Sequence, residues 1–292
     1  MKERWLVTGA GGKLGSVILG RLCHDGETAL GTVSPTGPRP FIGKAKSLDL
    51  MDTQRTAEMV QSFRPTIIVH AAAVSGPASV RSEPDRAMDV NVALTGRLAK
   101  LADQLGARLI YTSTDMVFDG EDAPYSELSS PAPTTEYGRT KLAGEHEALG
   151  STNSLVLRFP LLYGVPASCR TSHFVQLLQD LRTGQTTTLF ADEYRTPLWL
   201  EDAAAAIQLA ATQNVTGVVH LGGPERLSRL EMGYCMARSL GLPVDAIVGG
   251  SRLEAGDEEP RPKDLSLSSE LFQKVLDVAP GRRMAEAVRL AL

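Results

Sequence analysis

The sequence is poor in cysteine and histidine, and it has no long apolar run. Its cysteines, Cys23, Cys169 and Cys235, are odd in number and far apart, which argues against a disulfide framework and against a zinc site. The five histidines show neither HExxH spacing nor a cluster with carboxylates, so no metal site is expected. The formal net charge of -4 gives no reason to expect nucleic acid or an anionic membrane as a partner.

The lack of a long apolar segment also argues against a membrane-spanning helix. A glycine-rich motif begins almost at Met1, which leaves no room for a signal peptide, and we therefore expect a cytoplasmic protein. A chain of 292 residues can bury a large core, as one big α/β domain or as two unequal lobes.

Short apolar runs alternate with amphipathic stretches through the first half of the chain. The runs that we expect to form strands are residues 4–8, 28–33, 66–70, 108–112 and 154–158. Such alternation predicts an α/β fold with a doubly wound parallel sheet of the Rossmann kind. We expect residues 1–164 to form a dinucleotide-binding domain and residues 165–292 to form mainly a smaller C-terminal substrate-binding lobe. Segments near 186–222 are expected to return to the sheet.

The first expected strand is followed at once by a glycine-rich turn and then by a helical repeat. The turn reads Gly9-Ala10-Gly11-Gly12-Lys13-Leu14-Gly15. Glycine is needed where the backbone bends and where it approaches a pyrophosphate, whose charge is met by the first amides of the helix. Because strand and helix flank the turn as this mechanism requires, we expect it to bind a dinucleotide, with Lys13 adding positive charge. A plain glycine turn is the alternative.

The end of the second expected strand bears on which dinucleotide binds. A site for NAD usually has an acidic residue there, which binds the ribose diol, whereas a site for NADP often has an arginine. Here the strand leads into Ser34-Pro35 with no acidic residue, and Arg39 follows. The pattern favours NADPH and leaves NAD open, since Arg39 could also point to solvent.

Tyr137 and Lys141 are four residues apart in a segment that predicts a helix, so their side chains project from one face. An ammonium group beside a phenol stabilises the phenolate and lowers the phenol's pKa, which makes tyrosine a usable proton donor. The alternative is an ordinary pair on a helix surface.

Taken together, the motifs carry a family resemblance. The chain resembles the extended short-chain dehydrogenases/reductases, and most closely the dTDP-4-dehydrorhamnose reductase family, which includes the regulatory β subunit of methionine adenosyltransferase. Met116 stands where these reductases usually have an aromatic residue, and residues 158–164 are more similar to the regulatory subunit. The matching pieces are residues 9–15, His70-Ala71-Ala72-Ala73, Ser113-Thr114-Asp115, residues 117–120 and 124–127, Tyr137 with Lys141, Gly144-Glu145, Leu157-Arg158, Arg195-Thr196-Pro197 and Arg261-Pro262.

The resemblance implies a role for each of several residues. Thr114 would polarise a substrate carbonyl, Tyr137 would protonate its oxygen, and Lys141 would lower the pKa of Tyr137 and bind the nicotinamide ribose. Asp49 and Leu50 resemble the family's adenine contact, and an acid at the start of a helix before Thr53 is the alternative for Asp49. The resemblance suggests that Asn91 supports the active-site water network or the lysine. The expected cofactor-binding residues include Ala71, Ala72, Ala73 and Asn91, together with Ser34 and Arg39 after the second strand. Substrate contacts are implied for Asp115, Val117, Phe118 and Arg195. Phe118 in a core and Arg195 in a surface ion pair are the structural alternatives.

Three functions are compatible with this resemblance. The leading hypothesis is NAD(P)H-dependent reduction of the 4-keto group of a nucleotide-linked deoxysugar or a related small carbonyl compound, because the Thr114, Tyr137 and Lys141 set is intact. A cofactor-binding regulatory subunit and a sugar-nucleotide epimerase or dehydratase are the alternatives. The expected partner is a small molecule, with a sugar nucleotide favoured, and the sequence leaves a homodimer open.

Overall fold

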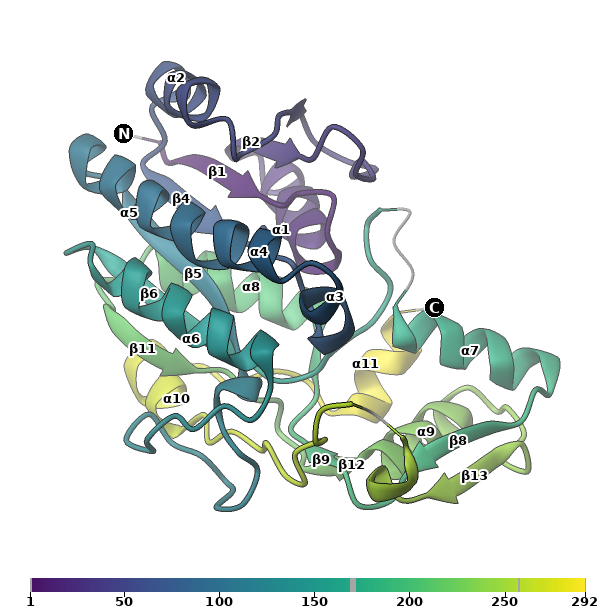
Figure 1. Ribbon diagram of the computed structural model, residues 1–292. Helices are drawn as coiled ribbons and strands as arrows, with labels where there is room; N and C mark the ends of the chain where they lie inside the picture. The colour runs from purple at the N-terminus through teal and green to yellow at the C-terminus, as the bar shows by residue number, and fades with distance from the viewer. Residues whose placement is uncertain (1, 169–171, 257, 292) are drawn as a thin grey trace.

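A seven-stranded parallel sheet forms the centre of the computed structural model, which describes residues 2–168, 172–256 and 258–291 (Figure 1). The strand order is β11-β6-β5-β4-β1-β2-β3. The order reverses between β1 and β4, which is where a doubly wound sheet opens a crevice at the carboxyl ends of its strands. The strands are β1 (Arg4–Thr8), β2 (Thr28–Val33), β3 (Ala45–Ser47), β4 (Ile67–His70), β5 (Arg108–Thr114), β6 (Ser154–Phe159) and β11 (Gly217–His220).

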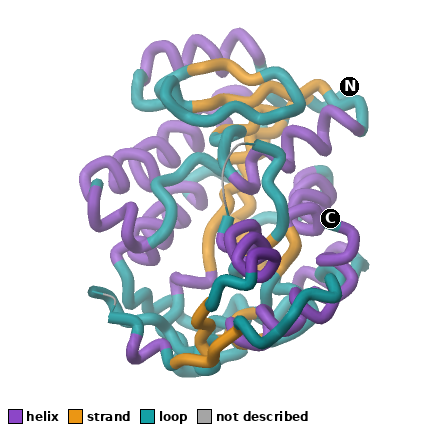
Figure 2. Tube along the Cα trace, turned by 90° about the vertical axis from the view of Figure 1, so that its right-hand side faces the viewer, coloured by secondary structure: helices purple, strands orange, loops and turns teal. Residues whose placement is uncertain are grey.

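Helices cover both faces of this sheet, which confirms the predicted Rossmann-like class. Successive strand residues point to opposite faces, so Trp5 and Val7 of β1 pack with α1 and α8, whereas Leu6 packs with α2, α5 and α6. In Figure 1, α5 and α6 lie in front of the sheet and α8 behind it, and Figure 2 shows helices on both sides of the strands. The helices are α1 (Lys13–His24), α2 (Thr53–Phe63), α5 (Leu94–Leu105), α6 (Glu136–Leu149), α8 (Leu200–Ala211) and α10 (Glu270–Leu276).

An apolar repeat at intervals of three and four, formed by Val90, Leu94, Leu98, Leu101 and Leu105, predicts one long helix, but the structure divides this segment in two. Leu94 and Leu98 are fully buried as the apolar repeat predicts, and α5 ends where Gly106 adopts a positive φ of 64°. Val90, however, belongs to a π-helical turn, η1 (Asp89–Ala93), that precedes α5. Two short helices, α3 (Pro77–Ser82) and α4 (Pro84–Met88), lead into this turn from β4.

A smaller lobe packs around a separate apolar core at the carboxyl-end side of the sheet (Figure 1). Of the segments near 186–222, β11 joins the sheet beside β6, but β8 pairs with β13 instead. The lobe contains α7 (His173–Thr183), β8 (Thr187–Phe190), α9 (Arg229–Ser239), β13 (Ile247–Gly250), η3 (Arg252–Glu254) and α11 (Met284–Leu290). Short strand pairs join β7 (Leu162–Tyr163) to β10 (Leu198–Trp199) and β9 (Tyr194–Arg195) to β12 (Leu227–Ser228).

Cys23 and Cys235 are free thiols, and Cys169 lies outside the described residues. Among the helices that the structure describes, none is both long and apolar enough to cross a membrane.

Replacement of glycine by alanine is expected to have opposite effects on stability at two positions inside helices, Gly144 and Gly20. A Cβ at Gly144 would lie 2.3 Å from the Asn91 carbonyl oxygen and 2.3 Å from the Tyr111 hydroxyl, whereas a Cβ at Gly20 would have one neighbour at 4.0 Å. We expect Gly144→Ala to lower the free energy of unfolding by about 1–3 kcal/mol through overpacking. Gly20→Ala should raise it by roughly 0.5–1 kcal/mol, because alanine is the better helix former. Urea denaturation of both variants checks the prediction, and a neutral Gly144→Ala would contradict the close packing.

Candidate active site

The glycine-rich turn has the geometry that a pyrophosphate site needs. Gly9 has a φ of 67°, and a Cβ there would lie 2.6 Å from the Ala72 amide nitrogen. Gly12 is the N-cap of α1 and no side chain caps this helix end, which leaves its first amides available to an anion. Gly15 packs on Gly9, since a Cβ at Gly15 would lie 2.3 Å from the Gly9 carbonyl oxygen. Ala10 is buried, Leu14 is half-buried and Lys13 is exposed.

The loop after β2 lies against this turn. A Cβ at Gly11 would lie 2.0 Å from the Pro38 carbonyl oxygen, so the loop crosses the second glycine of the motif. Ser34 and Arg39 are exposed on this loop. Both side chains are therefore open to solvent next to the expected adenosine site.

The residues expected around the adenine are only partly accessible. Asp49 is exposed, and its Oδ1 accepts a hydrogen bond from the Met51 amide at 3.0 Å. The neighbouring Leu50 packs against the core beneath α2. Asp52, not Asp49, caps α2, so Asp49 is not committed to the helix end. Ala71, Ala72 and Ala73 follow β4 and are half-buried beside Gly9.

The structure brings Thr114 and Tyr137 together at the carboxyl end of β5. Thr114 is buried, and its Oγ1 donates a hydrogen bond to Asp115 Oδ1 at 3.1 Å. Tyr137 is half-buried in the first turn of α6, and a hydrogen bond with Thr114 acts to lower its pKa. The Lys141 side chain is buried one turn further along α6. Its Nζ donates to the Thr112 carbonyl at 2.8 Å and lies 4.0 Å from the centre of the Tyr111 ring.

The expected effect of Lys141 on Tyr137 is not what this structure shows. Burial and then the negative charge of Asp115 raise the pKa of Tyr137 to about 12, and Lys141 is not among the causes. Burial also lowers the pKa of Lys141 to about 7, against the opposing charge of Glu145. The sequence spacing correctly placed both groups on one helix, but it did not reveal how strongly the site is buried. Tyr137 is therefore a protonated phenol at neutral pH.

Asn91 holds the site together and has no surface left for a cofactor. Its side chain is fully buried in the π-helical turn η1. Nδ2 donates to the Val74 carbonyl at 3.0 Å and to Thr140 Oγ1 at 3.0 Å, and Oδ1 accepts from the Val74 amide at 2.9 Å. Asn91 thus ties the loop after β4 to α6, so the predicted cofactor contact is replaced by a structural one.

Val117 and Phe118 are also too deeply buried to contact a substrate through their side chains. Both are 0% exposed in a cluster with Tyr125, Leu265 and Leu267. The Phe118 ring stacks on Tyr125 at a centroid distance of 4.2 Å. The structural alternative for Phe118, a place in a core, is therefore the observed one.

Asp115 and Arg195 form a buried ion pair at the end of β5. Arg195 Nε lies 3.4 Å from Asp115 Oδ2, and both side chains are buried. Burial raises the pKa of Asp115 to about 6, although the charge of Arg195 acts to lower it. Asp115 Oδ2 is a buried acceptor with no hydrogen-bond partner. A buried carboxylate oxygen that is ion-paired with Arg195 but accepts no hydrogen bond fits a site that receives a donor from a ligand.

The lobe adds a cationic cluster that the sequence did not reveal. The buried carboxylate of Glu193 is surrounded by Arg195, Arg229 and Arg261, with nitrogen–oxygen distances of 3.4, 4.0 and 3.2 Å. Burial lowers the pKa of His173 in α7, and the charges of Arg229, Lys13 and Arg261 lower it further. Lys13 of the glycine-rich turn is therefore close enough to His173 for its charge to act on this lobe residue. No motif marks Glu193, Arg229 or His173, because only the folded chain brings them together.

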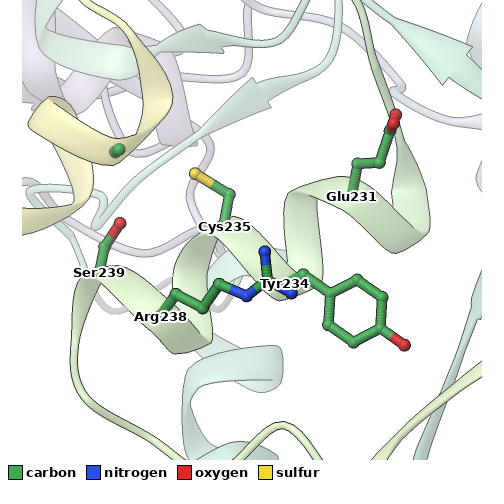
Figure 3. Close-up of a pocket in the computed structure, with 6 residues that line it drawn as sticks. Glu231, Tyr234, Cys235, Arg238 and Ser239 are labelled. Atoms are coloured by element: carbon green, nitrogen blue, oxygen red, sulfur yellow. The ribbon is translucent and has the colours of Figure 1, made fainter.

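Among the described residues, no group of three or more histidines, cysteines and carboxylates could hold a metal ion. A pocket of about 350 Å³ lies beside α9, and none of the predicted site residues lines it (Figure 3). The pocket is lined by Glu231, Tyr234, Cys235, Arg238, Ser239 and Ala285.

Solved structures share this architecture. A hypothetical dTDP-4-dehydrorhamnose reductase from Sulfolobus tokodaii has a TM-score of 0.85 at 27% identity and covers 97% of this chain and 98% of its own. The dTDP-4-dehydrorhamnose reductase of Bacillus anthracis, solved in complex with NADP, has a TM-score of 0.88 at 23% identity, covers 100% of this chain and 99% of its own, and shows the fold alone.

Curated proteins with similar sequences include a methionine adenosyltransferase subunit and a probable reductase. The methionine adenosyltransferase 2 subunit beta of Rattus norvegicus is 33% identical over 248 residues, which cover 82% of this chain and 73% of the rat protein. The probable low-salt glycan biosynthesis reductase Agl14 of Haloferax volcanii is 32% identical over 263 residues, 88% of this chain and 87% of that protein. Residues 3–291 match the RmlD substrate binding domain, and the chain therefore belongs to the RmlD substrate-binding domain family.

Proposed function

We propose that the protein is an NADPH-dependent reductase of the 4-keto group of a nucleotide-linked deoxysugar. The observation that carries the proposal is the meeting of Thr114 and Tyr137 above the buried Lys141, at the strand ends between the glycine-rich turn and the lobe. This is the edge where ligands bind in open α/β sheets. The reductase relatives in sugar metabolism favour the same substrate class.

Each residue has a separate task in the proposed reaction. The nicotinamide cofactor, when bound, supplies the hydride. Thr114 Oγ1 orients and polarises the carbonyl oxygen. Tyr137 gives that oxygen its proton, since the raised pKa keeps the phenol protonated at neutral pH. The buried Lys141 ammonium supplies positive charge where negative charge develops on oxygen.

The cationic cluster of the lobe supports a diphosphate-bearing substrate. Arginine binds phosphate oxygens in a bidentate manner, and Arg195, Arg229 and Arg261 are already gathered around one carboxylate. Asp115 Oδ2 would accept a hydrogen bond from a sugar hydroxyl near the reacting carbon, which would satisfy its missing partner.

The adenosine side supports NADPH over NADH. No acidic residue ends β2, and the exposed Arg39 on the following loop can pair with a 2′-phosphate. NADH is the alternative cofactor, because relatives of this fold were solved with NAD as well as with NADP.

A cofactor-binding regulatory subunit is the second candidate, favoured by the 33% identity to methionine adenosyltransferase 2 subunit beta. The two candidates differ in turnover. A protein that binds NADPH, oxidises it with no keto sugar, and changes the activity of a methionine adenosyltransferase would be regulatory.

Tyr137→Phe should lower the turnover of NADPH with 4-keto sugar nucleotides at least about a hundredfold, because it removes the proton donor. Absorbance of NADPH under steady-state conditions measures the rate. Tyr234→Phe, a half-buried tyrosine of α9, is the matched control and should leave the rate unchanged. Equal rates for Tyr137→Phe and the wild type would remove Tyr137 from the mechanism.

Arg39→Ala should weaken NADPH binding about tenfold, the equivalent of roughly 1.4 kcal/mol, and should leave NADH binding nearly unchanged. The reason is that only NADPH carries the 2′-phosphate. Thermal shift titrations with the two cofactors give both affinities. Arg182→Ala, at an exposed arginine of α7, controls for a general loss of positive charge. Tighter wild-type binding of NADH than of NADPH would contradict the assignment.

Asp115→Asn should stabilise the protein at pH 7 while it lowers turnover. The pKa of Asp115 is raised from 3.8 to about 6, so the folded state binds the proton more tightly than the unfolded state. The wild type therefore loses stability as pH rises from about 4 to about 6, by roughly 3 kcal/mol, and the loss persists above pH 6. Urea denaturation at pH 4 and pH 7 measures the free energy of unfolding of both proteins. The value for Asp115→Asn relative to the wild type should be higher at pH 7 than at pH 4. An equal difference at both pH values would show that Asp115 titrates normally.

A further inference from the structure

Glu145 is a buried carboxylate one helical turn after Lys141. Its side chain is 1% exposed, and it accepts hydrogen bonds from Arg158 Nε at 2.9 Å and from Arg158 Nη2 at 2.6 Å. Ser113 Oγ also donates to Glu145 Oε1. The carboxylate thus has three donors, two of them from a guanidinium group that is 5% exposed.

These contacts join the elements that carry the proposed catalytic groups. Ser113 precedes Thr114 in β5, and Arg158 lies in β6 beside it, with Ser113 and Arg158 in register. Tyr137, Lys141 and Glu145 are all in α6. One carboxylate therefore ties the strand that bears Thr114 to the helix that bears Tyr137 and Lys141.

The far side of Arg158 is also fixed. Its Nη1 lies 3.2 Å from His220 Nε2, and His220 Nδ1 lies 3.2 Å from the Tyr125 carbonyl oxygen. Arginine only donates, so Nε2 is the acceptor and Nδ1 carries the proton that is donated to Tyr125. Burial and the charge of Arg158 lower the pKa of His220 to about 4, which keeps this ring neutral. The guanidinium is therefore aimed at Glu145 by partners on both sides.

A buried ion pair of this kind is a weak source of stability. Removing two charges from water offsets much of their attraction, and apolar side chains of similar volume are often as stabilising. A role in the candidate active site therefore explains the Glu145–Arg158 pair better than a contribution to folding stability does.

We propose that Glu145 is a positioning residue for the reductase reaction proposed above: held by Arg158, it fixes Lys141 and Tyr137 against Thr114 and keeps a negative charge next to Lys141. The inference rests on the proposed function for its catalytic meaning. The effect of the Glu145 charge on Lys141 can be tested without substrate or cofactor.

Glu145 is the group near Lys141 that can supply a stabilising negative charge. The titratable groups that interact with Lys141 are Glu145 on α6, His70 on β4 and Tyr111 on β5. Burial lowers the pKa of His70 to about 3 and raises the pKa of Tyr111 well above 10, so both are neutral at pH 7. Within this set, Glu145 alone carries a charge that favours the ammonium form of Lys141.

The test is a direct titration of Lys141 in the full chain. Protein with ¹³C-labelled lysine side chains is titrated by NMR, and Lys141→Met assigns the signal. The wild-type midpoint should lie near pH 7, and Glu145→Gln should move it down by about one pH unit or more. Glu147→Gln, the same substitution at an exposed site of the same helix, should leave it in place. An unchanged midpoint in folded Glu145→Gln would overturn the proposal.

Turnover supplies the second measurement. With NADPH and a 4-keto sugar nucleotide, Glu145→Gln should lower kcat at least about tenfold with little change in KM. As pH rises, kcat should also begin to fall at a lower pH than in the wild type, in step with the lower Lys141 midpoint. A wild-type kcat and an unshifted pH profile in Glu145→Gln would refute the positioning role. Absence of turnover in the wild type would refute the proposed function, whereas the Lys141 titration would still decide the effect of the Glu145 charge on Lys141.

A double variant separates positioning from folding. Glu145→Gln combined with Arg158→Met removes both charges and leaves no unpaired one, so it should fold even if Glu145→Gln does not. The proposal requires that the Lys141 midpoint stay low and kcat stay reduced in this double variant. Recovery of both to wild-type values would show that the pair acts only through stability.

Discussion

The close approach of α6 to β5 is the constraint on which the candidate site depends. A Cβ at Gly138 would lie 2.1 Å from the Met116 carbonyl oxygen, and a Cβ at Gly144 would meet Asn91 and Tyr111. Only glycine at these two positions lets the helix lie so near the strand end. Tyr137 precedes the first contact and Lys141 lies between the two, so both reach the strand that carries Thr114. The short distance between the α6 backbone and the strand end is therefore what allows these side chains to meet.

The second constraint is electrostatic and acts between the sheet and the lobe. Glu193, beside β9, gathers three arginines, one of which also lies against Asp115 at the end of β5. A second carboxylate, Glu259, accepts a hydrogen bond from the Glu136 amide at the start of α6 and pairs with Arg81 of α3 at 2.8 Å. Charged contacts therefore hold the lobe against the edge where Tyr137 lies.

The sequence was sufficient for the fold and for the parts of the site that are local in the chain. Hydrophobic periodicity placed β1, β2 and β4 to β6 within two residues of their bounds, and the glycine spacing identified the turn before α1. Side-chain burial and direction were not predictable, because they depend on contacts between distant segments. Asn91 turned inward to Val74 and Thr140, Phe118 stacked on Tyr125, and burial outweighed Lys141 in setting the pKa of Tyr137.

The distribution of buried charge favours a catalytic over a purely regulatory protein. Asp115, Lys141 and Glu145 are each nine-tenths or more buried, and desolvation shifts the pKa of Asp115 and Lys141 toward their neutral forms. A scaffold that only held a nucleotide and a partner would gain stability by replacing such groups with apolar ones. Retaining them is understandable where a reacting oxygen needs a proton and nearby positive charge in a dry site. Asp115 Oδ2 points the same way, because this buried oxygen forms an ion pair with Arg195 but no hydrogen bond, and a ligand hydroxyl could supply one.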